Sequence, residues 1–132
     1  DSRPDKKVYA PTADGLAELA RWSAEPGEPE AIRSELAVRL RGLAHGDAYA
    51  VLSEVRRHRD AHAARLAYFE DETDRWYPDL ASVPKEQLPA YVVLRGGVLA
   101  QRQLVQWCDE ALATLVPVFA PDLVDSPSKD AP

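Results

Sequence analysis

The sequence predicts an all-α protein of about four helices, two of them long and antiparallel, preceded by one short β-strand. Two long stretches carry apolar residues at alternating three- and four-residue spacing, which is the pattern of amphipathic helices. Segments that contain proline and glycine separate the helical stretches. The chain opens on a basic ribbon that runs into an apolar pair, Val8 and Tyr9, and this favours a strand before the first helix.

The first two helices are expected to be short. The first begins after Thr12, whose hydroxyl can cap free N–H groups of the opening turn, and it ends near Trp22. The following segment, SAEPGEPE, breaks the helix with two prolines and a glycine. The second helix is expected from about Pro29 to Leu43. Its apolar stripe consists of Ile32, Leu36, Leu40 and Leu43.

The two long helices form the second part of the chain. One is expected from Ala48 to Trp76, with Asp47 as its N-cap. The other begins between residues 85 and 91 and runs to about Val116, where Pro117 is expected to end it.

These long helices carry more apolar surface than four helices can cover among themselves, so a partner chain is expected. A second copy would satisfy both surfaces at once, which predicts a homodimer through the last helix. The residues expected at this interface share one stripe and its margin: Leu94, Val98, Val105, Trp107, Cys108, Leu112, Leu115 and Phe119.

Composition narrows the class of protein. A length of 132 residues has room for one domain, and the single cysteine fits a reducing compartment. No apolar stretch is long enough to cross a membrane, and no signal peptide opens the chain, so a cytoplasmic protein is expected. A formal charge of -6 argues against nucleic-acid binding by the chain as a whole. Arg3, Lys6 and Lys7 cluster at the start, so any nucleic-acid contact is expected at that edge.

The residues that could carry catalysis do not form a constellation, so we expect no enzyme, no metal and no cofactor. His58 and His62 lie one helical turn apart, with Glu54 one turn earlier, which is the spacing of metal ligands. No third ligand is identifiable, and an ordinary histidine pair is favoured. Cys108 lies within an apolar stripe and has no paired histidine, so a core side chain is the better interpretation.

A pair of glycines inside the last helix requires a reason, because each costs about 1 kcal/mol relative to alanine. One reason is a kink or a close helix crossing, and the other is space left for a ligand or a partner side chain. If a ligand pocket exists, the expected residues are Trp22, Tyr68, Trp76, Gly96, Gly97 and Trp107.

Three segments carry a family resemblance. The first, KKVYAPTADGLAELARW, resembles the junction in PadR-type transcriptional regulators where the wing of a winged helix-turn-helix passes into a linking helix. IRSELAVRLRGLAHGD is similar to the start of that family's C-terminal helical domain, of the virulence-activator-alpha-like type. LRGGVLAQRQLVQWCDEALATL is similar to its closing helix, with Trp107 in the expected place. Pro11 departs from the pattern and should stop the strand at about Ala10.

The resemblance implies a fragment of a repressor whose helix-turn-helix is not in this chain. Residues 1–11 would be the last wing strand, 12–119 the dimerisation and effector domain, and 120–132 a disordered tail. It also implies homodimers that bind operator DNA through the missing domain and are released by small aromatic or phenolic effectors. Arg3, Lys6 and Lys7 would then contact DNA, or else lie in a solvated turn. The alternative is a free-standing helical interaction module without a DNA role.

Overall fold

A computed structural model describes residues 10–30 and 34–123 of the chain. The chain divides into two compact units, residues 1–33 and 34–132, and each is described by itself. All regular structure in the described ranges is helical, so the all-α prediction is confirmed there. The expected wing strand falls almost wholly outside the described residues, and Ala10 and Pro11 are irregular.

The first unit contains one helix, α1, over Ala13–Ser23. The predicted cap is confirmed: the backbone N–H of Gly15 donates to Thr12 Oγ1 at 3.0 Å. Arg21 forms ion pairs with Glu18 and Glu25, one turn away on either side. The described part of this unit is exposed throughout, Trp22 included.

The second unit opens with a short helix, α2, over Glu35–Arg41, and a 3-10 turn, η1, over Leu43–His45. The prediction of a helix from Pro29 is therefore wrong at its start. Pro29 and Glu30 are not helical, and the Ser34 hydroxyl caps the helix by accepting from the N–H of Ala37 at 3.1 Å.

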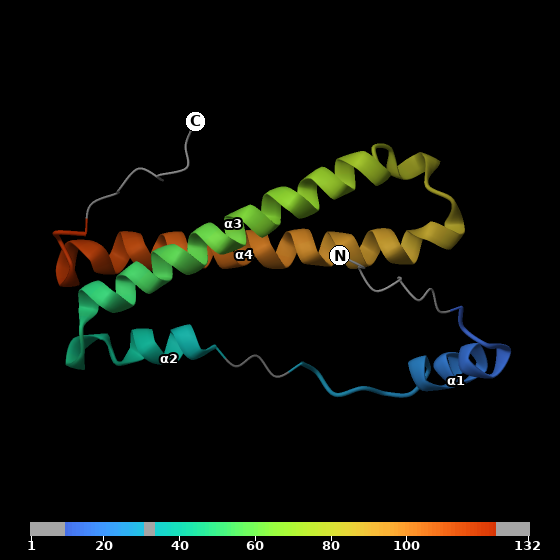
Figure 1. Ribbon diagram of the computed structural model, residues 1–132, viewed down its shortest axis with the longest axis horizontal. Helices are drawn as coiled ribbons and strands as arrows, with labels where there is room; N and C mark the ends of the chain where they lie inside the picture. The colour runs from blue at the N-terminus through green and yellow to red at the C-terminus, as the bar shows by residue number, and fades with distance from the viewer. Residues whose placement is uncertain (1–9, 31–33, 124–132) are drawn as a thin grey trace, which may run out of the picture. The chain divides into compact units, whose positions relative to one another are not determined.

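Two long helices follow, α3 over Ala48–Trp76 and α4 over Leu88–Phe119. They form the antiparallel pair that the sequence predicts, joined by the 3-10 turns η2 (Leu80–Ser82) and η3 (Lys85–Gln87), as Figure 1 shows. The bounds of α3 and its Asp47 cap are as predicted. The end of α4 is not, because the helix continues through Pro117 to Phe119. A proline so close to the end removes one N–H donor without stopping the last turn.

The core lies at one end of the α3–α4 pair, where α2 and η1 pack against the start of α3 and the end of α4. Its members are Leu36, Leu43, Leu52, Val55, Cys108, Ala120 and Leu123. The expected tail began at residue 120, yet Ala120 and Leu123 are buried in this core, so the folded domain extends at least to Leu123. Residues 124–132 of the expected tail lie outside the described residues.

Candidate interaction surface on the last helix

The stripe of α4 that was expected at a dimer interface packs against α3 of the same chain. Val98 and Cys108 each expose only 1% of their surface in the single chain. Neither has surface left for a partner, so these two are corrected to core residues. Leu112 and Leu115 are half-buried against the core, and Leu94 and Val105 are also half-buried. Trp107 and Phe119 remain exposed, at 37% and 41%.

Polar side-chain contacts also join α3 to α4. His62 Nδ1 lies 2.7 Å from Gln101 Oε1, and Arg59 Nε donates to Asp109 Oδ1 at 2.9 Å. Further along, Arg102 donates to Glu70 at 3.3 Å. These contacts specify one register of α3 against α4. The side of α4 that faces α3 is therefore already covered, and any partner of α4 must use another face of that helix.

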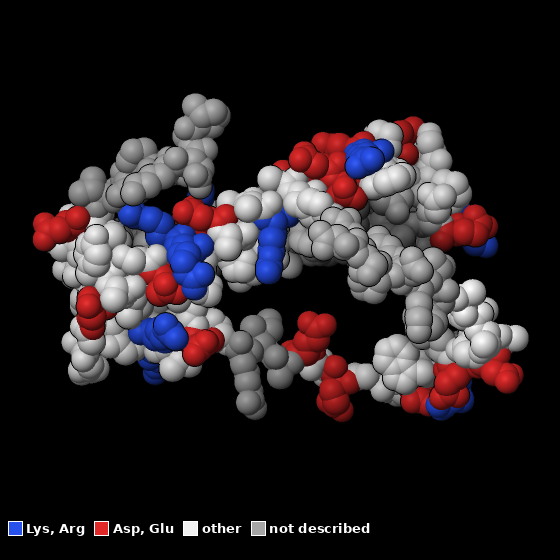
Figure 2. All heavy atoms as spheres, viewed as in Figure 1, with Lys and Arg blue, Asp and Glu red and all other residues white. Residues whose placement is uncertain are grey.

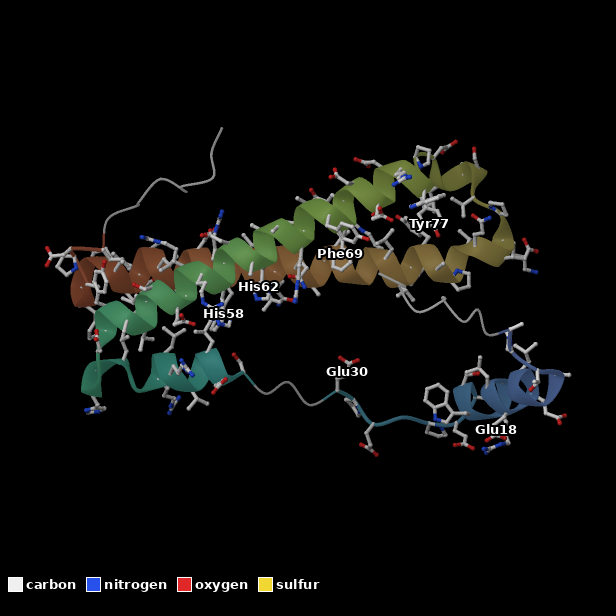
Figure 3. All side chains as sticks on the ribbon, viewed as in Figure 1. Glu18, Glu30, His58, His62, Phe69 and Tyr77 are labelled. Atoms are coloured by element: carbon white, nitrogen blue, oxygen red, sulfur yellow. The ribbon has the colours of Figure 1, made fainter. Side chains whose placement is uncertain are left out.

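The two neighbouring glycines of α4 have different surroundings. A Cβ atom at Gly97 would lie 3.4 Å from the ring of Phe69, which comes from α3 and is labelled in Figure 3. Gly97 therefore serves a close helix crossing, and the space beside it is filled by the chain itself. A Cβ atom at Gly96 would meet nothing within 4 Å. Nothing in the described part of the chain explains a helix-weakening residue at that position.

Gly96 belongs to an exposed face of α4 that sequence reasoning missed. The face, which we call the outer face, follows helical spacing over most of α4. Its residues are Leu88, Val92, Gly96, Leu99, Gln103, Trp107, Glu110 and Thr114, and all eight are exposed. Glu110 is the one charged residue among them. Val92 is 63% exposed and Leu99 is 48% exposed. The signal was present in the sequence as a second set of three-four spacings, hidden beside the stronger inner stripe.

Those residues predicted for a ligand pocket that belong to the second unit have different surroundings. Trp76 lines a pocket of about 240 Å³ at the hairpin tip, together with Tyr77, Pro78, Asp79, Ser82, Val83, Pro84 and Gln87. Tyr68 is exposed and its ring contacts Phe69. Gly97 is closed by Phe69, and Trp22 belongs to the other unit. A second pocket, of about 270 Å³, is lined by Arg56, Leu112, Ala113, Val116, Pro117 and Leu123.

The histidine pair that the sequence places at metal-ligand spacing lies on α3. The rings of His58 and His62, labelled in Figure 3, lie 6.3 Å apart. Glu54 is engaged by Arg57, whose Nη2 donates at 2.8 Å, and this hydrogen bond lowers the pKa of the Glu54 carboxyl. In the described part of the chain, no group of three or more His, Cys, Asp or Glu side chains is placed to hold a metal ion.

The charges of the second unit are unevenly distributed. Acidic side chains gather over the second half of α3, where Figure 2 shows a red cluster. The residues concerned are Glu70, Asp71, Glu72 and Asp74. A phosphate backbone would be repelled there. Arg3, Lys6 and Lys7, which were expected to contact DNA, lie outside the described residues.

Comparison with protein families gives a match to the C-terminal domain of virulence activator alpha over residues 32–116, which include α2, α3 and most of α4. The chain belongs to this virulence activator alpha C-terminal family. A relative from Mycobacterium tuberculosis, a probable transcriptional regulator, is 36% identical over 123 residues, covering 86% of this chain and 65% of the relative.

The fold of this chain is also found in a solved structure. The Vibrio cholerae virulence activator AphA superposes with a TM-score of 0.75 at 24% sequence identity, covering 83% of this chain and 65% of that protein. The chain thus spans about two thirds of the length of each protein that it matches. None of the helices in the described residues has the length and apolar character needed to cross a membrane.

Proposed function

We propose that the chain is the C-terminal dimerisation and effector-response domain of a PadR-like transcriptional repressor that acts in the cytoplasm. The observation that carries the proposal is the family match over residues 32–116, together with a relative that is named as a transcriptional regulator. The segment that resembles the end of a wing, KKVYAPT, supports a winged helix-turn-helix before it. In this proposal the domain is not an enzyme, and its role is to bring two DNA-reading domains together.

Dimerisation is what such a domain would contribute physically. Two copies related by a two-fold axis fix the distance between two DNA-reading helices, and that distance must match the spacing of two operator half-sites. A small aromatic effector that binds one arrangement of the helices better than another would change this distance. The exposed aromatic side chains Trp22, Tyr68, Trp76 and Trp107 support an aromatic effector.

The experiment that tests the proposal uses the longer protein encoded by the complete reading frame that contains this chain. Selection of DNA duplexes from a random pool should enrich a pseudo-palindromic sequence, and light scattering should show a dimer on that sequence. A reading frame that encodes no winged helix, or a pool that yields no consensus, would instead support the free-standing interaction module.

A further inference from the structure

The pocket at the tip of the α3–α4 hairpin has a lining that combines aromatic rings with a carboxylate. We propose that this pocket binds a small quaternary ammonium compound of the choline type, with the cation against the Trp76 ring and close to Asp79. This inference goes beyond the proposed function, because the ligand is a cation where the expected effector is a phenolic compound, and because its binding does not require DNA.

The pocket is small, and contacts within the chain hold its walls in place. Its volume is about 240 Å³, below the roughly 300–1,000 Å³ of most ligand sites. Asp79 accepts hydrogen bonds from the N–H of Ala81 at 3.1 Å and from the Ser82 hydroxyl at 2.7 Å. The ring of Tyr77, labelled in Figure 3, meets the ring of Tyr91 from α4 edge to face, with 5.6 Å between their centroids. A ligand of few atoms therefore meets walls that need little rearrangement.

Trp76 supplies the aromatic face of the pocket. It is 60% exposed, and its Nε1 donates to Glu72 Oε2 at 2.9 Å, which fixes the ring and places a carboxylate beside it. The guanidinium carbon of Arg75 lies 5.1 Å from the centroid of the same ring. The ring thus already attracts a cation from its own chain, and indole is the side chain that binds cations most strongly through its face.

The charges around the pocket favour a cation over an anion. Asp79 is the only charged residue among the described residues that line it. Over residues 70–79 the acidic residues are Glu70, Asp71, Glu72, Asp74 and Asp79, and Arg75 is the one basic residue. A phenolic acid would bring a further negative charge next to these carboxylates and be repelled, whereas a cation would be attracted.

The hydrogen bonds of the site favour a cation that has no N–H donors. Both carboxylate oxygens of Asp79 already accept hydrogen bonds, and Glu72 accepts one from Trp76. A primary ammonium carries three donors, each of which needs an acceptor in place of water. A quaternary ammonium makes no such hydrogen bonds and is recognised by aromatic faces and negative charge. The pocket provides these two features.

Choline and its uncharged isostere 3,3-dimethylbutan-1-ol test the role of the charge. Saturation-transfer NMR on the methyl protons of each compound should show that choline binds this chain at least about fivefold more tightly. Equal binding of the two compounds, no binding of choline at millimolar concentration, or tighter binding of the phenolic acid p-coumarate would each overturn the inference. None of these measurements involves DNA, so such a failure would leave the proposed regulator standing. A reading frame without a winged helix would overturn the regulator and leave the pocket standing.

Three variants and a matched control locate the site. Trp76→Leu removes the ring, and Asp79→Asn removes the charge while keeping an acceptor for the N–H of Ala81. Each should weaken choline binding at least about fivefold while the helicity, measured by circular dichroism, stays unchanged. Arg75→Gln should instead tighten binding, because it removes the guanidinium that competes for the ring. The control Tyr49→Leu removes an aromatic side chain that is 53% exposed near the other end of α3, and it should leave the affinity unchanged. Folded Trp76→Leu and Asp79→Asn variants that bind choline like the wild type would overturn the inference.

Discussion

At the residue scale, two adjacent glycines illustrate what sequence can and cannot tell. The sequence identified Gly96 and Gly97 as unusual and left two explanations open, a close crossing or a reserved space. The structure assigns the close crossing to Gly97, because Phe69 lies against it. Which of two neighbours faces inward depends on the rotation of the helix about its axis. That rotation is set by packing against α3, and the pattern of apolar residues in the sequence constrains it only loosely.

The variant Gly97→Leu should destabilise the chain by about 1–3 kcal/mol, because the added side chain would overlap the Phe69 ring in a packed contact. Urea denaturation followed by circular dichroism measures this change. The matched control is Gly96→Ala, which should keep or increase stability, by up to about 1 kcal/mol, because it adds helix propensity without a clash. Equal effects at the two positions would show that the rotation of α4 is different.

Cys108 offers a second test at this scale. Its side chain is buried, and burial raises the pKa of the thiol, with a smaller contribution from the nearby Asp109 carboxylate. A raised pKa means less thiolate at any given pH, and thiolate is the reactive form. At pH 8 the native chain should therefore react slowly with a thiol reagent such as Ellman's reagent, and the rate should rise steeply in denaturant. Complete reaction of the native chain within seconds would contradict the burial.

At the element scale, helix starts with a clear cap were predictable, while the start of α2 and the end of α4 were not. Thr12 and Asp47 each cap the helix that the sequence placed after them, because a capping side chain acts within its own turn. The start of α2 was missed because Ser34, also a capping residue, was read as part of the helix. Pro117 was read as a terminator, although a helix near its end tolerates proline. The inner stripe of α4 was correctly found, but its members Val98 and Cys108 are buried within the chain itself.

The packing of that stripe within the chain predicts the effect of Leu112→Asp. Leu112 packs against the core of its own chain, so a charge there should unfold the domain and not merely separate subunits. We expect a loss of roughly 2–3 kcal/mol in the free energy of unfolding, measured by urea denaturation. The volume-conserving control Leu112→Met should cost less than about 1.5 kcal/mol. A folded, fully monomeric Leu112→Asp variant would return Leu112 to the dimer interface.

At the scale of the whole molecule, the sequence predicted the helical class and the type of the C-terminal domain, while the outer face of α4 required coordinates. The order of caps, breaks and amphipathic stretches is a property of the chain, and it led to the virulence-activator-alpha type of domain that the comparison shows. The outer face of α4 became visible only when α3 was seen to cover the inner stripe. Two faces of one helix can both carry apolar residues in the sequence, and only the packing shows which face is covered by another helix of the same chain.

The charge of the whole molecule leads to the last prediction, which concerns DNA. The chain carries a net charge of -6, and its long helices present an acidic cluster on α3, so nonspecific attraction to DNA should be weak. Arg3, Lys6 and Lys7 can supply phosphate contacts, which position a protein on DNA but do not read sequence. Selection from a random pool of DNA duplexes with this chain alone should therefore enrich no consensus sequence. Residual binding to DNA, measured by fluorescence anisotropy, should disappear between roughly 50 and 200 mM salt, because phosphate contacts release counterions. A consensus recovered with this chain alone would mean that the helices described here read DNA themselves, and the division of labour in the proposed regulator would be wrong.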